Sequence, residues 1–314
     1  MLNIKNKTLY NKLKGKIKYD FNLSNQTWFK SGGSTKFYFE PYDEKELKIF
    51  LSAIDRENII EILGAGSNTL VRDGGISGIT IKLGRKFKEF KKLENNKILV
   101  GAGYNCIKLA RKLANQGLSG LEFFSGIPGT IGGAIKMNAG AYEEETSNRL
   151  ISIRAISFDG QINLIKREDI KMSYRKSSFA SDLIFIEAIF QCEEGNVDEN
   201  LSKLKVLNQK RSETQPIKSN TGGSTFKNPS SLKAWKLIRE SNSSELRVGK
   251  AKISELHANF IENDEEFFFT YGDGVTDADL GAELAFHRAH GKMATVLGVR
   301  PLARYGSLSY EGSI

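Results

Sequence analysis

Hydrophobic residues recur along most of the chain in short runs, some alternating with polar residues and others spaced as on one face of a helix. Short alternating or continuous apolar runs predict strands, whereas apolar residues three or four positions apart predict helices. We therefore predict strands at residues 59–63, 79–83, 97–100 and 184–190, a β-hairpin at 154–165, and helices at 106–117, 197–211 and 231–240.

Local signals indicate where these elements turn, begin and end. Asp159-Gly160 lies between alternating residues and predicts a tight hairpin turn. Gly117 follows an apolar helical pattern and is expected to end it, and Ser231 is expected to cap the helix that follows it. The apolar run 59–63 is expected to be a buried strand. The order of elements lacks the regular strand–helix alternation of a doubly wound sheet.

Composition restricts the class of protein. The 314 residues suffice for two or three domains, and 39% are hydrophobic, as in ordinary soluble proteins. No apolar run is long enough to span a bilayer, and the lysines near the N-terminus precede no apolar block, so we expect no signal peptide. The two cysteines, Cys106 and Cys192, are far apart and predict core residues of a cytoplasmic protein rather than a disulfide framework or zinc site.

The formal net charge of +9 has two readings, an anionic partner or a lysine-rich proteome. We favour the second, because the lysines are scattered along the chain and no zinc-finger or RNA-binding signature is present. We expect a monomer without nucleic-acid or membrane partners.

Composition changes abruptly near residue 264. Residues 1–264 contain 31 lysines and 22 asparagines, whereas residues 265–314 contain one lysine and no asparagine. A domain boundary alone seldom produces such a change, so we infer a different origin for the last fifty residues.

Two glycine-rich segments stand out, LGAGSNTLVRDGG at 63–75 (glycine loop 1) and SGIPGTIGGAIKMNAGAY at 125–142 (glycine loop 2). Glycine removes the Cβ atom and permits positive φ, so that backbone amides can approach a phosphate closely. Tight surface turns are the alternative. A Rossmann site is disfavoured, because Thr69 stands where its third glycine belongs. We therefore predict one extended dinucleotide lying across both loops, with side-chain donors from Ser67, Asn68, Thr130 and Asn138.

Six motifs in order make the chain resemble the UDP-N-acetylenolpyruvoylglucosamine reductases, also called UDP-N-acetylmuramate dehydrogenases. The motifs are TWFKSGGSTKFYFEP, ILGAGSNTLVRDGGISGITI, GLSGLEFFSGIPGTIGGAIKMNAGAY, MSYRKSSF, KRSETQPIKSNTGGSTFKNP and RVGKAKISELHANFIEN. The resemblance covers about residues 20–263. It implies an α+β fold with an FAD-binding, vanillyl-alcohol-oxidase-like (PCMH-type) domain of two subdomains. It also implies NADPH-dependent reduction of UDP-N-acetylglucosamine enolpyruvate to UDP-N-acetylmuramate for peptidoglycan.

The resemblance implies that FAD lies along Trp28–Gly33 and both glycine loops. The implied cofactor-binding residues are Gly32, Gly33, Gly64, Gly66, Ser67, Asn68, Thr69, Leu70, Gly126, Ile127, Pro128, Gly129, Thr130, Gly133, Asn138, Gly140, Ala141 and Tyr142.

The same resemblance assigns the chemistry. Arg175 matches the family's arginine, which stabilises the negative charge that develops on the substrate, and Ser224 matches its proton-donating serine. Tyr174, Lys227 and Asn228 are expected to contact the substrate carboxylate or phosphate. Outside these motifs, Tyr174-Arg175 would read as a strand end with a surface cation, and Ser224 as a turn serine. We interpret His257 as a structural residue.

The resemblance ends near residue 263. The family continues to a third catalytic residue, a glutamate, whereas here the chain reads TYGDGV and DADLGAELAFHRAHG, which resembles an internal fragment of glucose-1-phosphate cytidylyltransferases. In those enzymes the aspartate corresponding to Asp273 helps to hold magnesium, but their GGxGTRL-type nucleotide loop is absent from this chain. We expect no metal site.

We therefore predict an FAD domain at 1–205, an incomplete substrate domain at 206–263 and an unrelated tail at 264–314. The alternative to an active reductase is an inactive or unstable flavin-binding chimera.

Overall fold

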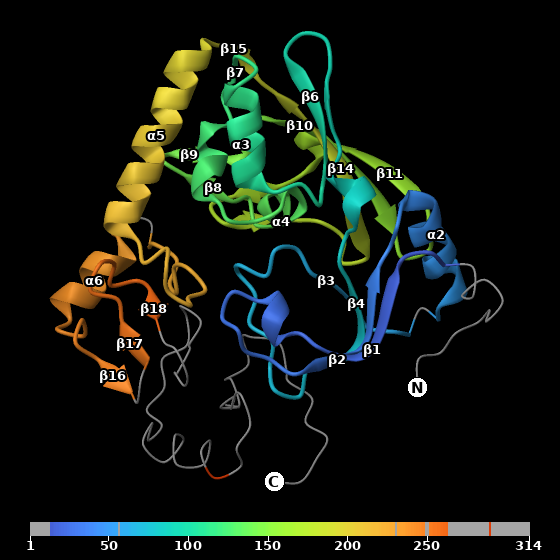
Figure 1. The fold of residues 1–314 in the computed structure, drawn as a ribbon, viewed down its shortest axis with the longest axis horizontal. Coiled ribbons are helices and arrows are strands. Elements are labelled where there is room, and N and C mark those ends of the chain that lie inside the picture. Colours follow the sequence, from blue (N-terminus) through green and yellow to red (C-terminus); the bar gives the residue numbers. More distant parts are fainter. Residues whose placement is uncertain (1–12, 56, 230, 249–250, 263–288, 290–314) are drawn as a thin grey trace.

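The computed structural model describes residues 13–55, 57–229, 231–248, 251–262 and 289. Two β-sheets form the body of the molecule, and a smaller C-terminal region lies to one side of them (Figure 1). In the described part of the chain, no helix is both long and apolar enough to span a membrane.

The first sheet has the strand order β1-β2-β4-β3. Its strands are β1 (Lys16–Asn22), β2 (Ser34–Glu40), β3 (Ile60–Ile62) and β4 (Ile76–Ile81), and helix α2 (Glu44–Ala53) connects β2 to β3. β1 is antiparallel to β2, whereas β2 and β3 both run parallel to β4. Asp43 begins α2, because its carboxylate accepts the Glu46 backbone N–H.

The second sheet is antiparallel and has the order β11-β10-β14-β6-β5. Its strands are β5 (Phe90–Lys92), β6 (Lys97–Gly101), β10 (Leu150–Ser157), β11 (Ile162–Lys166) and β14 (Leu183–Gln191). Helices α3 (Cys106–Ala114) and α4 (Ile131–Lys136) belong to the same half of the chain, as do the short pairs β7–β15, β8–β9 and β12–β13. These pairs are β7 (Leu118–Ser119) with β15 (Glu193–Glu194), β8 (Gly140–Ala141) with β9 (Glu144–Glu145), and β12 (Met172–Ser173) with β13 (Lys176–Ser177).

One continuous hydrophobic core joins the two sheets. It contains Phe39 and Phe50 from the first sheet and its helix, and Val100 and Phe190 from the second. The rings of Phe39 and Phe50 lie 4.2 Å apart, as expected for a packed aromatic pair. The two sheets therefore share one hydrophobic core, and this core supports the loops at their edges.

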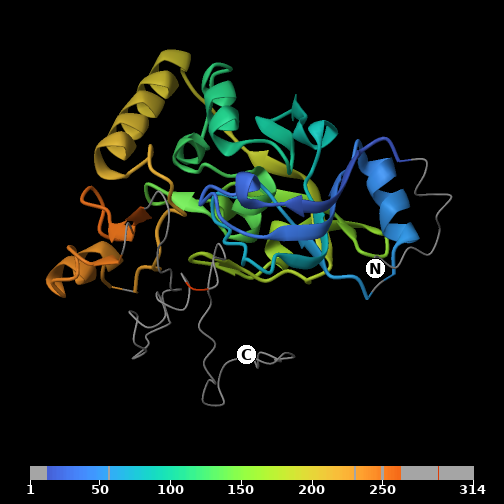
Figure 2. The ribbon, with the colours of Figure 1, turned by 60° about the horizontal axis from the view of Figure 1, so that its bottom comes forward.

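The C-terminal region (residues 215–262) is reached through the long helix α5 (Val197–Thr214), which runs along one side of the molecule (Figures 1 and 2). It contains α6 (Ala234–Glu240) and the three-stranded sheet β16-β17-β18, formed by Arg247–Val248, Ala251–Ile253 and Ile261–Glu262. Because α5 is one continuous helix through residue 205, no break in the chain marks the domain boundary that we predicted there. The predicted tail at 264–314, including Asp273, lies outside the described residues apart from residue 289.

Most predicted elements are present, and two expectations are wrong. A strand forms at Ile60–Ile62, within the predicted range 59–63, but it is the exposed edge strand β3. Ile62 is 40% exposed, and Ile59, just before the strand, is 54% exposed. Ser231 does not cap α6, because that helix begins at Ala234. Instead the Asn228 side-chain oxygen accepts the Ala234 N–H at 2.9 Å.

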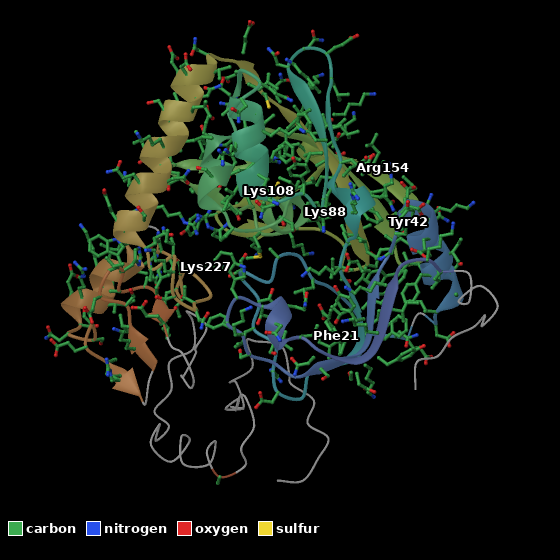
Figure 3. The ribbon with its side chains drawn as sticks, in the orientation of Figure 1. Phe21, Tyr42, Lys88, Lys108, Arg154 and Lys227 are labelled. Carbon is green, nitrogen blue, oxygen red and sulfur yellow. The ribbon has the colours of Figure 1, made fainter. Side chains whose placement is uncertain are left out.

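An ion cluster joins α2 to the second sheet. The Arg154 guanidinium on β10 donates to both carboxylate oxygens of Glu44, at 2.7 and 2.8 Å, and to Glu187 at 3.2 Å. Figure 3 places Arg154 beside α2. Burial alone would raise the pKa of Glu44, but the hydrogen bonds and charges of Arg154 and Lys48 outweigh it and hold this pKa below its usual value.

We expect Arg154→Met to lower the free energy of unfolding by about 1 kcal/mol at pH 7, because it removes a partly exposed ion cluster. The lowered pKa of Glu44 means that this stabilisation is complete above the usual carboxyl pKa and is lost as the pH falls through the lowered one. Urea unfolding at neutral pH and near pH 3 would measure both effects. The difference between variant and parent should shrink in acid. Lys166→Met, which removes the exposed Lys166–Glu168 pair, serves as the control and should leave the urea midpoint unchanged.

Candidate active site

The two glycine loops meet in the structure. A Cβ atom placed on Gly64 would lie 2.8 Å from the Thr130 hydroxyl oxygen, so only glycine allows loop 1 this close to loop 2. Farther along both loops, a Cβ atom on Gly129 would lie 4.0 Å from the Ser67 hydroxyl. Two segments about sixty residues apart thus form one surface, as a ligand shared between them requires.

The segment at residues 27–33 (the Phe29 loop) completes this surface. The Trp28 N–H donates to the Gly66 carbonyl at 2.9 Å, and the Gly33 N–H donates to the Arg72 carbonyl at 2.8 Å. Gly32 and Gly66 both have positive φ, +120° and +69°, which explains why glycine occupies these turns. All three predicted FAD segments are therefore adjacent.

The residues of this surface fit an extended dinucleotide such as FAD. The hydroxyl groups of Ser31 and Ser125 are buried and have no hydrogen-bond partner among the described residues. Ser125 as a whole is only 2% exposed. Buried polar groups without partners are rare, and hydroxyls beside glycine turns suit the oxygens of a pyrophosphate. Most of the predicted cofactor residues are partly accessible; Gly32, Gly66 and Asn138 are the buried ones.

The side chain of Asn138, predicted to donate to the cofactor, bonds to neighbouring segments of the protein. Asn138 is fully buried, its amide nitrogen donates to the Ser173 carbonyl at 3.0 Å, and its oxygen accepts the Ser147 N–H at 3.0 Å. Both polar atoms of its amide therefore already have partners within the protein. It fixes glycine loop 2 to the hairpin β12–β13.

That hairpin carries Arg175. Arg175 adopts φ +52°, as a tight turn between Ser173 and Lys176 demands, and its guanidinium donates to the Gly140 carbonyl of glycine loop 2 at 2.6 Å. The guanidinium carbon also lies 4.9 Å from the centre of the Tyr174 ring. Arg175 is thus a cation held at the edge of the predicted cofactor surface.

The C-terminal region and helix α5, which leads to it, each contact the same surface. Gly222 packs directly on the ring of Phe29, where a side chain would have no room. The Tyr142 hydroxyl donates to the Leu207 carbonyl of α5 at 2.9 Å. Between the Phe29 loop and residues 217–220 lies a cavity of about 320 Å³, which is lined mainly by polar side chains and by Trp28, Lys30 and Lys82.

Ser224 lies on the loop of the C-terminal region that begins at Thr221 and Gly222. Its side chain is exposed, and Gly223 before it has φ +82° and open space on its Cβ side. Sequence reasoning missed the residue that holds this loop, Asn259, although it lies within the quoted HANF motif. Its side chain forms two hydrogen bonds with the backbone of Phe226. No residue spacing in the sequence predicts these two bonds.

The predicted substrate residues differ in their surroundings. Tyr174 is 47% exposed, and Lys227 is exposed on the side of the C-terminal region that faces the sheets (Figure 3). The side-chain oxygen of Asn228 already caps α6, so its contribution to ligand binding is restricted to its remaining polar atoms.

Neither cysteine is a candidate nucleophile, and the described residues contain no cluster of His, Cys, Asp and Glu suited to a metal ion. Both cysteines are buried core residues, as predicted, and burial raises the pKa of Cys106 and raises that of Cys192 to about 12. Burial lowers the pKa of His257, whose ring packs on Phe260.

Known proteins match both the FAD-binding half of the chain and its C-terminal region. Residues 35–164 match the model of the FAD binding domain, and residues 215–269 match the C-terminal domain of UDP-N-acetylenolpyruvoylglucosamine reductase. The reductase of Rickettsia bellii (strain RML369-C) is 43% identical over 251 residues, 80% of this chain and 83% of the relative, and that of Rickettsia canadensis is 42% identical over 252 residues.

The crystal structure of the reductase from Thermus caldophilus is 30% identical and superposes with a TM-score of 0.69, covering 88% of this chain and 94% of the other. These matches confirm the predicted FAD-binding α+β fold. By sequence, by domain composition and by fold, the chain belongs to the UDP-N-acetylenolpyruvoylglucosamine reductase family.

Proposed function

We propose that the protein reduces the enolpyruvyl ether of UDP-N-acetylglucosamine enolpyruvate, with FAD as cofactor and NADPH as reductant, and forms UDP-N-acetylmuramate for peptidoglycan synthesis. The observation that carries this proposal is the junction of the glycine loops at Gly64 and Thr130, with Arg175 hydrogen-bonded to the same surface at Gly140. A family member needs both a cofactor surface and a cation beside it.

The chemistry supplied by bound FAD would be hydride transfer from NADPH to the vinyl methylene carbon of the substrate. We propose that the glycine loops and the Phe29 loop hold FAD. The partnerless hydroxyl groups of Ser31 and Ser125 and the accessible backbone of Gly126 to Thr130 support this assignment. Tyr142 and Ala141 would border the cofactor, while Asn138 supports the loop from inside.

Arg175 would stabilise the negative charge that the hydride transfer creates on the neighbouring carbon and its carboxylate. A planar guanidinium matches a carboxylate in shape and remains charged at every pH of interest. Its bond to the Gly140 carbonyl supports this role, because an already oriented cation needs little reorganisation during the reaction.

Ser224 would then donate its hydroxyl proton to the carbon that carries the charge and recover a proton from solvent. A hydroxyl is a weak acid, so it can act only beside a strongly basic carbon centre. Tyr174 and Lys227 would bind the carboxylate or phosphate groups of the substrate, and their exposure supports that role. Asn228 would contribute to the same site through the atoms that its cap of α6 leaves available.

The alternative of an inactive chimera depends on residues 264–314, which nearly all lie outside the described part of the chain. A measurement of substrate-dependent NADPH oxidation by the FAD-loaded full chain distinguishes an active reductase from an inactive chimera. Turnover establishes the reductase, whereas bound flavin without substrate-dependent turnover would contradict it.

We further propose that the protein acts as a cytoplasmic monomer without a nucleic-acid partner, in line with its scattered lysines.

We expect Ser224→Ala to slow substrate reduction by about 10²- to 10⁴-fold, the usual contribution of a general acid. Flavin reduction by NADPH should be unaffected, since that step needs no proton from Ser224. Stopped-flow measurement of the two half-reactions would separate them. Ser212→Ala removes an exposed hydroxyl on α5 and should match the parent in both steps.

Arg175→Lys should slow the same half-reaction by roughly 10²-fold, because an ammonium group keeps the charge but loses the bidentate geometry. Binding of FAD should persist, since Arg175 is proposed to act on the substrate. A parental rate of substrate reduction in this variant would remove Arg175 from the mechanism.

Gly64→Ala should weaken FAD binding by roughly tenfold or more, because the added methyl group would separate the two glycine loops at a cost of about 1–3 kcal/mol. Gly74→Ala provides a matched control within loop 1, since a Cβ atom there meets nothing within 4 Å. Flavin fluorescence titration of the two apoproteins would measure the difference. Equal affinities would argue against a cofactor shared between the loops.

A further inference from the structure

Asn259 is nearly inaccessible to solvent, and the oxygen and the nitrogen of its side-chain amide both bond to one residue. It is 4% exposed, its side-chain oxygen accepts the Phe226 N–H at 2.9 Å, and its side-chain nitrogen donates to the Phe226 carbonyl at 2.8 Å. Its own carbonyl also accepts the Thr225 N–H at 2.8 Å. These three bonds imitate the pairing of a β-strand, although no strand is present at residues 224–226.

Glycines precede Ser224 in the loop that these bonds hold. Two glycines, Gly222 and Gly223, precede Ser224, and Gly223 has open space where a side chain would be. An isolated bridge pairs Ser224 with Phe260, immediately after Asn259. The bonds to Thr225 and Phe226 therefore fix the backbone directly after Ser224, whereas Gly223 directly before it has no neighbour on its Cβ side.

We infer that Asn259 is a positioning residue for Ser224, fixing the backbone that aims the Ser224 hydroxyl at the substrate carbon. The inference rests on the proposed role of Ser224 as proton donor. Asn259 does not touch the substrate in this scheme; it acts through the direction of the Ser224 Cα–Cβ bond. Displacement of a reacting group by about 1 Å can reduce a rate by about 10²-fold.

The chemistry offers a readout that a merely structural residue would not change. The carbon that receives the proton bears a carboxylate, an ether oxygen and a methyl group formed by the hydride, so protonation makes it a stereocentre. A fixed Ser224 hydroxyl delivers the proton to one face. A displaced hydroxyl lets water compete from either face, and the product becomes a mixture of two epimers.

The test uses the FAD-loaded full chain with Asn259→Ala. We expect substrate reduction to slow by about 10- to 100-fold, flavin reduction by NADPH to keep its parental rate, and the epimeric product to become detectable by NMR. Asn200→Ala is the matched control. Asn200 is also a buried asparagine, 1% exposed, that donates to a backbone carbonyl, that of Leu118, but it holds α5 rather than the Ser224 loop. It should give parental rates and a single epimer.

Asn259→Asp covers the case in which the alanine variant does not fold. Its ionised carboxylate can accept the Phe226 N–H but cannot donate to the Phe226 carbonyl, whereas the protonated carboxyl group can do both. The rate of substrate reduction relative to the parent should therefore rise as the pH is lowered from about 8 to about 5.5, because burial raises a carboxyl pKa. A constant ratio in a folded Asn259→Asp protein would overturn the inference.

The outcomes distinguish the inference from the function on which it rests. If Ser224→Ala slows substrate reduction but a folded Asn259→Ala retains the parental rate and a single epimer, the positioning role of Asn259 is wrong. If Ser224→Ala itself has no effect, the proton-donor role is wrong and the inference falls with it.

Discussion

The close approach of the two glycine loops is the constraint on which the rest of the site depends. Loop 1 connects β3 to β4 within the first sheet, and loop 2 contains α4, which belongs to the second half of the fold. Gly64 and Thr130 nevertheless come within the distance that a methyl group would fill. This is possible because one hydrophobic core joins both sheets and fixes the position of one sheet relative to the other. A surface made of backbone from two subdomains can follow a long, flexible dinucleotide without bulky side chains in its way.

Two buried asparagines each join a pair of segments around this surface. Asn138 joins glycine loop 2 to the hairpin of Arg175, and Asn259 joins the turn after the β17 strand to the loop of Ser224. An asparagine side chain presents a donor and an acceptor side by side, as a β-strand residue presents its own N–H and C=O, so it can replace a strand where the backbone must turn. Leaving the partners of such a buried amide unsatisfied costs more than the bonds themselves contribute, which makes these loops stiff.

Sequence reasoning reached much of this site because its residues lie in local motifs. The strands and long helices follow from apolar spacing, and the meeting of the glycine loops followed from asking what two such loops could share. The features that sequence reasoning did not predict have a common physical cause. The exposure of β3, the capping of α6 by Asn228 and the internal bonds of Asn138 all depend on which segment packs alongside, and a single sequence carries no record of its tertiary neighbours.

The placement of Ser224 relative to Arg175 follows from how the C-terminal region is attached. Arg175 is bonded to glycine loop 2, whereas Ser224 belongs to a loop that rests on Phe29 through Gly222. The bond from Tyr142 to Leu207 ties α5, and through it the C-terminal region, to the end of glycine loop 2. Both attachments of the C-terminal region therefore lie on segments proposed to hold FAD. A cofactor bound along the glycine loops and the Phe29 loop would therefore also fix the distance between Arg175 and Ser224. If these two residues act as proposed, cofactor binding would help to assemble the site in addition to supplying the hydride.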